Sequence, residues 1–170
     1  MNQKIIDWTE RMRKEHVHQA GRVIDIGSLN VNGTVKHLFS DATEYIGIDF
    51  RAGKDVDIVC NAHDLVPDHI YPGSVATVVC MNMLEHDDQF WLTLEQIDAM
   101  LIKGGYLYLC IPTFTFPQHD HPRDYWRAGV DAFHDVLLKG FKILNIETVY
   151  TKDINGKGIN PVLCGLGVKL

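Results

Sequence analysis

The segment Val75–Met81 (VATVVCM) constrains the fold most, because it forms a strand-length run without a charged residue. A strand with one face in water alternates apolar and polar residues, whereas a strand in a sheet covered on both faces stays apolar throughout. Similar segments at 22–26, 45–48, 56–60 and 106–111 are separated by stretches with helical spacing or by turns. This alternation predicts a largely parallel sheet with right-handed crossovers and helices on both faces.

The remaining elements follow from periodicity and from glycine. Helical spacing predicts helices at 3–19, 34–39, 90–102 and 129–139, with Gly21 after the first and Lys103-Gly104-Gly105 closing the third. Two final strands, 141–149 and 161–169, are joined by a short Gly/Asn-rich segment at 155–160, which favours an antiparallel hairpin. We therefore expect one domain over 1–170, with an N-terminal helix within residues 1–20 and a three-layer α/β sandwich around a seven-stranded sheet.

Composition narrows the function classes. The chain has 22 acidic and 16 basic residues and a formal net charge of -6, so we expect no general nucleic-acid partner. No apolar run reaches the roughly 20 residues that span a bilayer, and the charged N-terminus lacks the apolar stretch of a signal peptide. The four cysteines are widely spaced and lie in or beside apolar runs, which predicts buried, reduced thiols. We expect a cytoplasmic protein without a membrane partner.

Two strand ends carry the residues of a candidate ligand site. The first strand runs through Asp25 to Gly27 and opens into a loop that closes at Gly33, and the second strand ends at Asp49. Ligands of such sheets bind at the carboxyl ends of the strands, where glycine permits close backbone approach. A carboxylate at the end of the second strand can accept both hydroxyls of a ribose. These positions predict a nucleotide-like ligand.

Six segments, in order, resemble the motifs of class I S-adenosylmethionine-dependent methyltransferases. They are DIGSLNVNG, YIGID, CNAHDL, VVCMNMLEH, LIKGGYLYLCIP and HDHPRDYWR, within roughly residues 22–145. The fourth to sixth are similar to the methyltransferase type 11 group in particular. The resemblance implies a Rossmann-like fold with a mostly parallel sheet and an antiparallel C-terminal hairpin strand. It also implies S-adenosyl-L-methionine as cofactor and methyl transfer as the activity.

Carried over by position, the resemblance implies a cofactor site with four parts. Gly27 and Ser28 line the methionine moiety, Asp49 holds the ribose, and Phe50 packs on the adenine. Asn61 with the backbone of Ala62 and His63 reads the adenine edge, and Met81 and Asn82 form the floor. The full expected set is Asp25, Gly27, Ser28, Asn32, Gly33, Asp49, Phe50, Asn61, Ala62, His63, Met81 and Asn82.

Three departures from the family pattern bear on this site. The glycine loop is two residues longer than usual, with Leu29 and Val31 where glycines ordinarily stand. Asn61 replaces the acidic residue that faces the adenine amino group, and Lys103 replaces a proline. An asparagine carbonyl still accepts a hydrogen bond, so weaker but retained cofactor binding is expected.

We expect the segments that follow the fourth and fifth strands to bind the methyl acceptor. Methyl transfer requires positioning of two reactants and exclusion of water, with a proton acceptor for hydroxyl or protonated amine acceptors. Tyr125, like Trp126, can wall the methyl group, while Arg127 can clamp an anionic acceptor or tie the loop by an ion pair. The candidate catalytic residues are His86, His119, His121, Asp124, Tyr125 and Arg127.

Several alternatives stay open. His86 can instead brace the helix that starts near Phe90, and HDHPRDYWR can be a packed lid. A nicotinamide oxidoreductase is disfavoured because the loop lacks GxGxxG, but a non-catalytic cofactor-binding protein is compatible with the altered motifs. A metal-dependent hydrolase is a further alternative. His119 and His121 with Asp120 or Asp124 lack a third ligand fixed by spacing, so no metal site is predicted. We expect a small-molecule or glycan-type acceptor; the sequence leaves the oligomeric state open.

Overall fold

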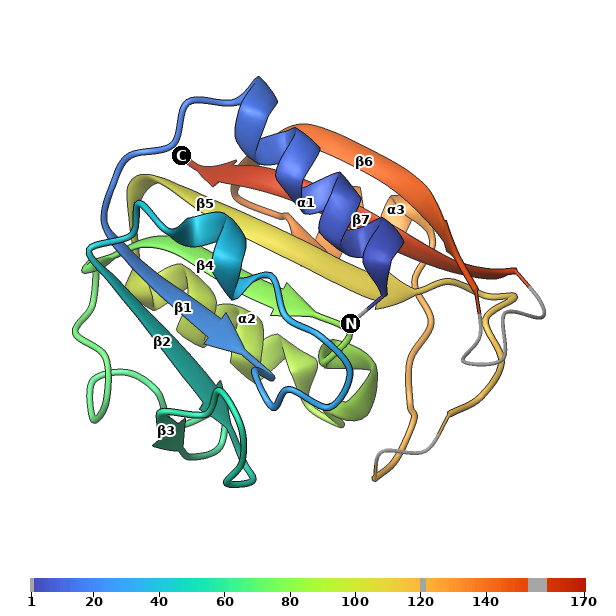
Figure 1. Cartoon of the computed structure of the whole chain (residues 1–170), viewed down its shortest axis with the longest axis horizontal. Coiled ribbons are helices and arrows are strands. Elements are labelled where there is room, and N and C mark those ends of the chain that lie inside the picture. Colours follow the sequence, from blue (N-terminus) through green and yellow to red (C-terminus); the bar gives the residue numbers. More distant parts are fainter. Residues whose placement is uncertain (1, 120–121, 153–158) are drawn as a thin grey trace.

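A computed structural model describes residues 2–119, 122–152 and 159–170 and arranges them in three layers around one sheet (Figure 1). The strand order is β3-β2-β1-β4-β5-β7-β6, and β7 alone runs antiparallel to its neighbours. This confirms the predicted Rossmann-like α/β fold with its antiparallel hairpin strand. The strands are β1 (Arg22–Ile26), β2 (Glu44–Asp49), β3 (Ile58–Val59), β4 (Val75–Met81), β5 (Leu101–Pro112), β6 (Phe141–Thr151) and β7 (Asn160–Lys169).

Strand β4 is central, as its composition predicts. It pairs in parallel with β1 and β5, and all its side chains are buried. Val78 and Cys80 point to one face of the sheet, whereas Val79 and Met81 point to the other. The absence of charged residues therefore reflects burial on two sides.

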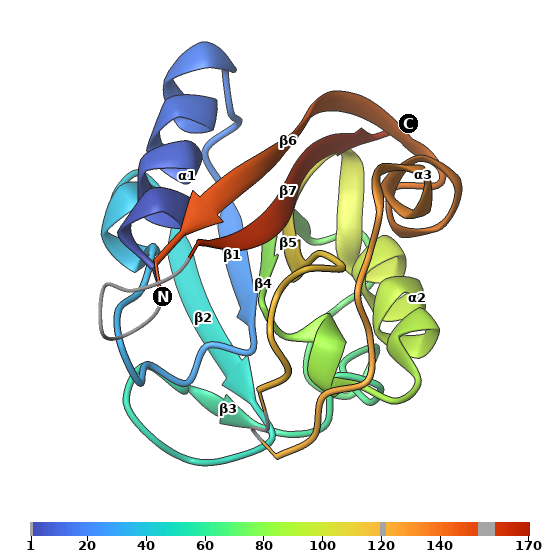
Figure 2. The same cartoon turned by 90° about the vertical axis from the view of Figure 1, so that its right-hand side faces the viewer.

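Helices cover both faces of the sheet (Figure 2). On one side, α1 (Gln3–Glu15) and the 3₁₀ turn η1 (Lys36–Phe39) pack through residues such as Trp8, Met12 and Phe39. On the other, α2 (Phe90–Met100) packs beside α3 (Val130–Ala132) and the π-helical turn η3 (Phe133–Leu137). Among the described residues, no helix is both long and apolar enough to cross a membrane.

Tertiary contacts shift several boundaries from the predicted ones. The first helix ends at Glu15, not 19, and beyond it His18 stacks on Tyr106 and hydrogen-bonds the Tyr108 hydroxyl. Helix α2 ends at Met100 because Leu101 already pairs with Val75 of β4, so β5 begins before Gly104-Gly105.

In three further segments the structure has shorter or interrupted elements where longer, regular ones were predicted. The segment 34–39 forms only the 3₁₀ turn η1, and 56–60 contributes only the two-residue strand β3. The helix expected at 129–139 is split into α3 and η3, whose Phe133 packs in the core. Of the linker expected at 155–160, residues 155–158 lie outside the described residues. Cys80, Cys110 and Cys164 are buried free thiols, as predicted, while Cys60 is partly exposed.

Candidate active site

The loop after β1 crosses directly onto the end of β2. Gly27 has a φ of 81°, which an L-residue with a side chain rarely adopts, and its N–H donates to the carbonyl of Ile48. The N–H of Ser28 donates to the same carbonyl at 3.0 Å. A Cβ on the neighbouring Gly47 would lie 2.0 Å from the Asp55 carbonyl oxygen. The backbones of β1, β2 and the following loop are therefore held closer than side chains would permit.

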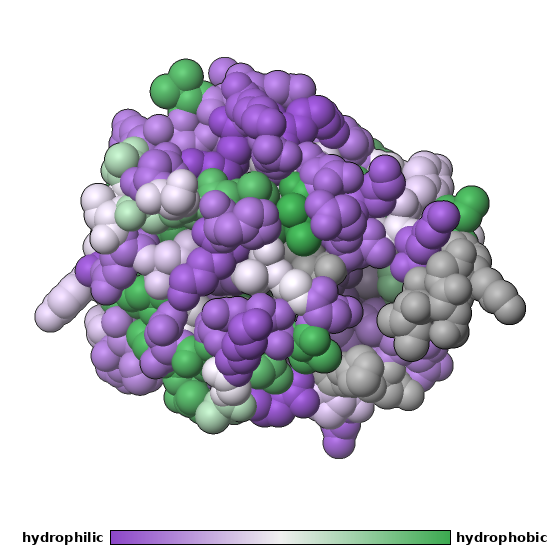
Figure 3. All heavy atoms as spheres, viewed as in Figure 1, coloured by the Kyte–Doolittle hydropathy of each residue, from purple (hydrophilic) through white to green (hydrophobic). Residues whose placement is uncertain are grey.

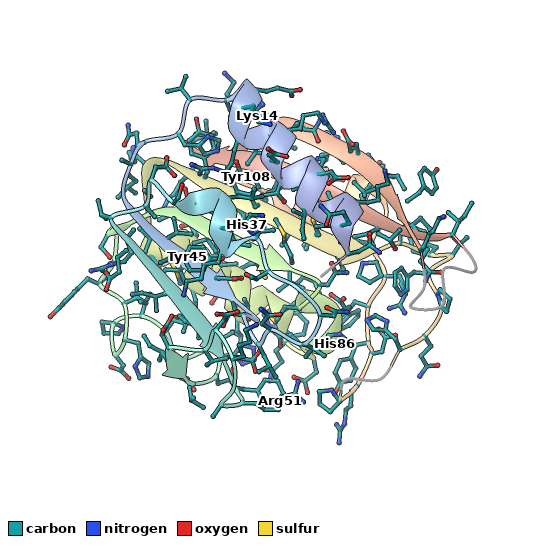
Figure 4. The ribbon with its side chains drawn as sticks, viewed as in Figure 1. Lys14, His37, Tyr45, Arg51, His86 and Tyr108 are labelled. Carbon is teal, nitrogen blue, oxygen red and sulfur yellow. The ribbon has the colours of Figure 1, made fainter. Side chains whose placement is uncertain are left out.

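Asp49 stands at the carboxyl end of β2 and is buried. Its Oδ1 accepts the Arg51 N–H at 2.9 Å, and its Oδ2 accepts the Leu29 N–H at a longer 3.4 Å. Each carboxylate oxygen thus retains lone pairs for further donors. Phe50 follows with an exposed ring, over which the Arg51 guanidinium lies 5.0 Å from the centroid (Figure 4).

Asp25 is buried behind the loop, inside β1. Its Oδ2 accepts a hydrogen bond from the Tyr45 hydroxyl at 2.7 Å. Burial raises the pKa of the Asp25 carboxyl to about 6, an effect that the Tyr45 hydrogen bond partly opposes. The side chain therefore braces β2 from within the sheet; Tyr45 is a partner that sequence reasoning missed.

The two extra residues of the glycine loop have a structural explanation. Asn30 fastens the loop to the segment after β2, because its side chain donates to Asp55 at 2.6 Å and its N–H donates to the Lys54 carbonyl. The same side chain accepts the N–H of Gly33 at 2.8 Å. Leu29 lies against Gly53, where a Cβ would come within 2.2 Å of it. The longer loop, including exposed Asn32, is thus pinned rather than loose.

The third predicted segment turns around Asn61. Its side-chain oxygen accepts the N–H of His63 at 3.0 Å, and Ala62 packs on the core. The His63 ring lies 2.9 Å from Asp87, which also accepts from the Thr93 hydroxyl. Asp87, which the sequence analysis overlooked, therefore joins this segment to the chain after β4.

The floor predicted after β4 is formed by a sharp change of direction. Met81 is buried, and Asn82 adopts a φ of 54°, a left-handed conformation that asparagine tolerates better than most residues. The Asn82 N–H donates to the Cys110 carbonyl at 2.8 Å, which keeps it beside β5. The chain then enters the 3₁₀ turn η2 (Leu84–His86).

Turn η2 buries a carboxylate beside two imidazoles. The Glu85 side chain is 0% exposed, and its Oε1 lies 3.8 Å from Nε2 of His86 and 3.7 Å from Nε2 of His119. Neither Glu85 oxygen has a hydrogen-bond partner among the described residues. The Glu85 carboxylate raises the pKa of the His119 imidazole, although burial acts in the opposite direction. His86 is labelled in Figure 4.

Residues 113–119 and 122–129, which we call the strap, pack over η2 (Figure 2). The Tyr125 N–H donates to the Glu85 carbonyl at 2.7 Å, and Trp126 Nε1 donates to the Asp87 carbonyl. The strap therefore holds His119 against Glu85, although β5 separates them in sequence.

Arg127 locks the strap from within. All five of its N–H donors are used: two reach the Asp124 carboxylate at 2.5 and 2.6 Å, and three reach strap carbonyls. The guanidinium lowers the pKa of the Asp124 carboxyl to about 2. Of the two predicted uses of Arg127, tying the loop agrees with this geometry, and no donor is left for an anionic acceptor.

A shallow pocket of about 270 Å³ opens beside this cluster. Its lining comes from the strap: Phe116, Gln118, Asp124, Tyr125 and Arg127. Tyr125 is 40% exposed and lines the pocket, whereas Trp126, 37% exposed, is not part of the lining and packs edge-to-face on Phe90 of α2. Tyr125 is therefore placed to contact a ligand in the pocket.

The predicted residues thus fall into two groups along the carboxyl edge. The carboxyl ends of β1, β2, β3 and β4 and the segments that follow them carry the predicted cofactor set, while η2 and the strap bring together His86, His119, Asp124, Tyr125 and Arg127. His121 and Asp120 lie outside the described residues. Glu85 was missed as a site residue, although an acidic residue four positions after a buried strand without charged residues is a usable signal.

The face in Figure 3 is mostly hydrophilic, with hydrophobic side chains gathered along its lower edge over the ends of β2 and β3. Large apolar residues are exposed in the loop after β1, after β2 and in β3, namely Val31, Phe50 and Val59. Exposed apolar groups beside a buried carboxylate are typical of a binding surface for a ligand with a flat, uncharged part.

Several solved structures with a similar fold are methyltransferases. A Burkholderia thailandensis 1,6-didemethyltoxoflavin-N1-methyltransferase, solved with 1,6-didemethyltoxoflavin and S-adenosylhomocysteine, superposes with a TM-score of 0.72 at 14% identity, over 97% of this chain and 78% of that one. S-adenosylmethionine-dependent methyltransferases from Archaeoglobus fulgidus (TM-score 0.70, 14% identity, 96% and 94% covered) and Methanosarcina mazei (0.68, 13%, 94% and 97%) are similar. At such identities the likeness shows the fold.

Sequence comparison adds nothing to this. No family model matches the chain, and no curated protein matches it. The expected type 11 subgroup therefore stays a prediction.

Proposed function

We propose that this protein transfers the methyl group of S-adenosyl-L-methionine to a small-molecule or glycan-type acceptor. The observation that carries the proposal is the position of Asp49 and the Gly27 loop. They lie at the carboxyl ends of β2 and β1, next to the point between β1 and β4 where the strand order reverses. Open α/β sheets bind their ligands at such a point.

The residues at this edge fit the cofactor chemically. The buried Asp49 carboxylate has free lone pairs on both oxygens and would hold the two ribose hydroxyls. The tight backbone at Gly27 and Ser28 would face the methionine part, with Asp25 behind it and Asn32 and Gly33 closing the loop. Exposed Phe50 would pack on the adenine, and the turn Asn61–His63 would face its edge, above Met81 and Asn82.

The cofactor supplies a methyl group on a positively charged sulfur. The chain must place an acceptor atom in line with it, exclude water, and take up a proton where the acceptor carries one. The strap pocket would hold the acceptor, with Tyr125 as an aromatic wall. The cluster of Glu85, His86 and His119 would take up the proton that the acceptor loses. Asp124 and Arg127 would act as positioning residues that keep His119 in place.

A small acceptor suits the pocket. Its volume of about 270 Å³ matches a compact group better than a polymer surface. The Burkholderia neighbour was solved with a small molecule, 1,6-didemethyltoxoflavin, bound beside S-adenosylhomocysteine. The net charge of -6 gives no support to a nucleic-acid acceptor.

A calorimetric binding panel tests the proposal. We expect S-adenosylmethionine and S-adenosylhomocysteine to bind and NAD and NADP not to bind. Asp49→Ala should remove most of the thermal shift caused by S-adenosylhomocysteine, and Asp49→Asn should remove part of it. Asp135→Ala, at an exposed aspartate of η3, is the matched control and should bind like the wild type.

Two outcomes are decisive. Equal binding by the Asp49→Ala variant would contradict the ribose assignment. Tight binding without methylation of any acceptor in an extract containing labelled cofactor would favour a non-catalytic binding protein, the alternative raised by Asn61 and the altered loop.

A further inference from the structure

We propose that Glu85, His86 and His119 form a binding site for a divalent transition-metal ion. Each offers one ligand atom, and these atoms all lie within 4.8 Å of one another. From sequence, His119 had no third ligand fixed by spacing; the fold supplies Glu85 and His86 from η2. The set does not depend on residues outside the described part of the chain.

The distances suit a shared ion. Zinc binds imidazole nitrogen and carboxylate oxygen at about 2.0–2.2 Å, so two tetrahedral ligands stand about 3.3–3.5 Å apart. The Glu85 Oε1 atom lies 3.8 Å from His86 Nε2 and 3.7 Å from His119 Nε2. A contraction of a few tenths of an ångström brings the Glu85 oxygen to this spacing with each imidazole. The ligand atoms of the two imidazoles lie within 4.8 Å of each other, and side-chain rotation must bring them closer to complete the coordination.

The burial of Glu85 is the independent sign of a ligand. Its side chain is 0% exposed, and neither oxygen accepts a hydrogen bond from any described residue. A buried carboxylate without a hydrogen bond is costly, and proteins satisfy such groups with a hydrogen bond, a counter-charge or a metal. A cation between Glu85 and the two imidazoles satisfies it directly.

Both imidazoles are oriented for ligation through Nε2. Nδ1 of His86 donates to the Arg123 carbonyl at 2.5 Å, which leaves the unprotonated Nε2 facing Glu85. Nδ1 of His119 makes no hydrogen bond to a described residue but lies 3.4 Å from the Asp124 carboxylate, which Arg127 holds with two hydrogen bonds. A carbonyl or carboxylate behind a ligating histidine is the usual outer shell of protein metal sites.

The ligand types select the metal. Two imidazoles and one carboxylate suit Zn²⁺ and other first-row divalent ions, whereas Mg²⁺ and Ca²⁺ prefer sets built from oxygen. Three protein ligands leave a coordination position open. If the proposed function holds, an acceptor oxygen can bind there, and its hydroxyl proton is then lost to water more readily. That consequence rests on the proposed function, but the metal site does not.

Calorimetry with Zn²⁺ alone tests the site on full-length, tag-free, chelator-treated protein without cofactor. We expect one Zn²⁺ per chain at this site, a rise in melting temperature, and no response to Mg²⁺. Glu85→Gln and His119→Ala should each weaken Zn²⁺ binding by 100-fold or more. His37→Ala is the control, because His37 is exposed on η1, away from His86, and should bind like the wild type (Figure 4).

The Glu85→Gln variant also separates a metal ligand from a structural residue. Without metal it should melt above the wild type, because a buried charge is removed; with Zn²⁺ the order should reverse. Its affinity for S-adenosylhomocysteine should stay unchanged, so failure of the metal site is distinguishable from failure of the proposed function. Absence of saturable Zn²⁺ binding, or equal binding by wild type and Glu85→Gln, would overturn the inference.

Discussion

The buried carboxylates at the two ends of the candidate site differ in their hydrogen bonding. On the cofactor side, Asp25 accepts from the Tyr45 hydroxyl, and Asp49 accepts from two backbone N–H groups. On the acceptor side, Glu85 is more deeply buried but accepts from no described residue. Both ends lie on the same edge of one sheet, so the difference reflects local construction and not the fold.

This contrast indicates how each end does its work. Hydrogen bonds on the cofactor side fix the loops before any ligand arrives, which lowers the cost of ordering them. On the acceptor side the framework is fixed by Arg127 and Asp124, while the groups in its centre are left with unused bonding capacity. Buried groups without hydrogen bonds are rare in proteins and call for an explanation such as a bound ligand. The Ser28 hydroxyl is one such group on the cofactor side, whereas the buried carboxylate without hydrogen bonds lies on the acceptor side.

The largest effect is expected at the strap. Arg127→Ala leaves the Asp124 carboxylate, 1% exposed, without its guanidinium partner and with the His119 N–H as a remaining donor, and should lower the free energy of unfolding by about 3 kcal/mol. Arg127→Lys should recover little, because an ammonium cannot replace five planar donors. Urea denaturation measures both. The affinity for S-adenosylhomocysteine should stay near that of the wild type; a parallel loss would mean that the two ends are not independent.

The next effect concerns Asp25 and pH. Burial raises the pKa of this carboxyl to about 6, so the folded state holds its proton more tightly than the unfolded state. The resulting stability is complete below about pH 4 and is lost as pH rises through 6, a change of about 3 kcal/mol. Asp25→Asn should therefore gain stability over the wild type between pH 4.5 and 7.5. A constant difference across that range in denaturant titrations would contradict this.

A smaller loss is expected from Tyr45→Phe, which removes the hydroxyl that Asp25 uses. A buried acceptor left without its donor should cost about 1–2 kcal/mol in unfolding free energy at pH 7. Tyr106→Phe is the control: its hydroxyl donates to the Val17 carbonyl at an exposed site and should matter less. If both variants lose the same unfolding free energy, the buried hydrogen bond of Tyr45 contributes no more to stability than the exposed one of Tyr106.

The smallest effect is expected at the adenine edge. Asn61→Asp restores the carboxylate typical of the resembled family, and a charged acceptor makes the stronger hydrogen bond. One carboxylate oxygen can keep the His63 N–H while the other faces the ligand. We expect about threefold tighter binding of S-adenosylhomocysteine by calorimetry. Unchanged or weaker binding would show that Asn61 serves the turn alone.

Much of the fold, and the edge of the sheet that carries the candidate site, could be predicted because both follow from local sequence patterns. The apolar run of β4 specifies a central strand, and the order of strands, helices and glycine turns specifies a Rossmann-like sheet. From that topology alone, Gly27 and Asp49 fall on adjacent strand ends. The prediction failed where tertiary contacts override periodicity, as when His18 leaves α1 to meet Tyr106 and Tyr108.

The sequence by itself determined the layers, the direction of the strands and the edge that carries the site, because hydrophobic periodicity and turn residues act over short distances. Only the tertiary structure decided that Glu85 is buried between His86 and His119, since the strap returns His119 from beyond β5. The tertiary structure also decided that every N–H group of the Arg127 guanidinium donates a hydrogen bond within the strap. Such contacts depend on how segments that are distant in the sequence pack together, and local sequence patterns do not encode this packing.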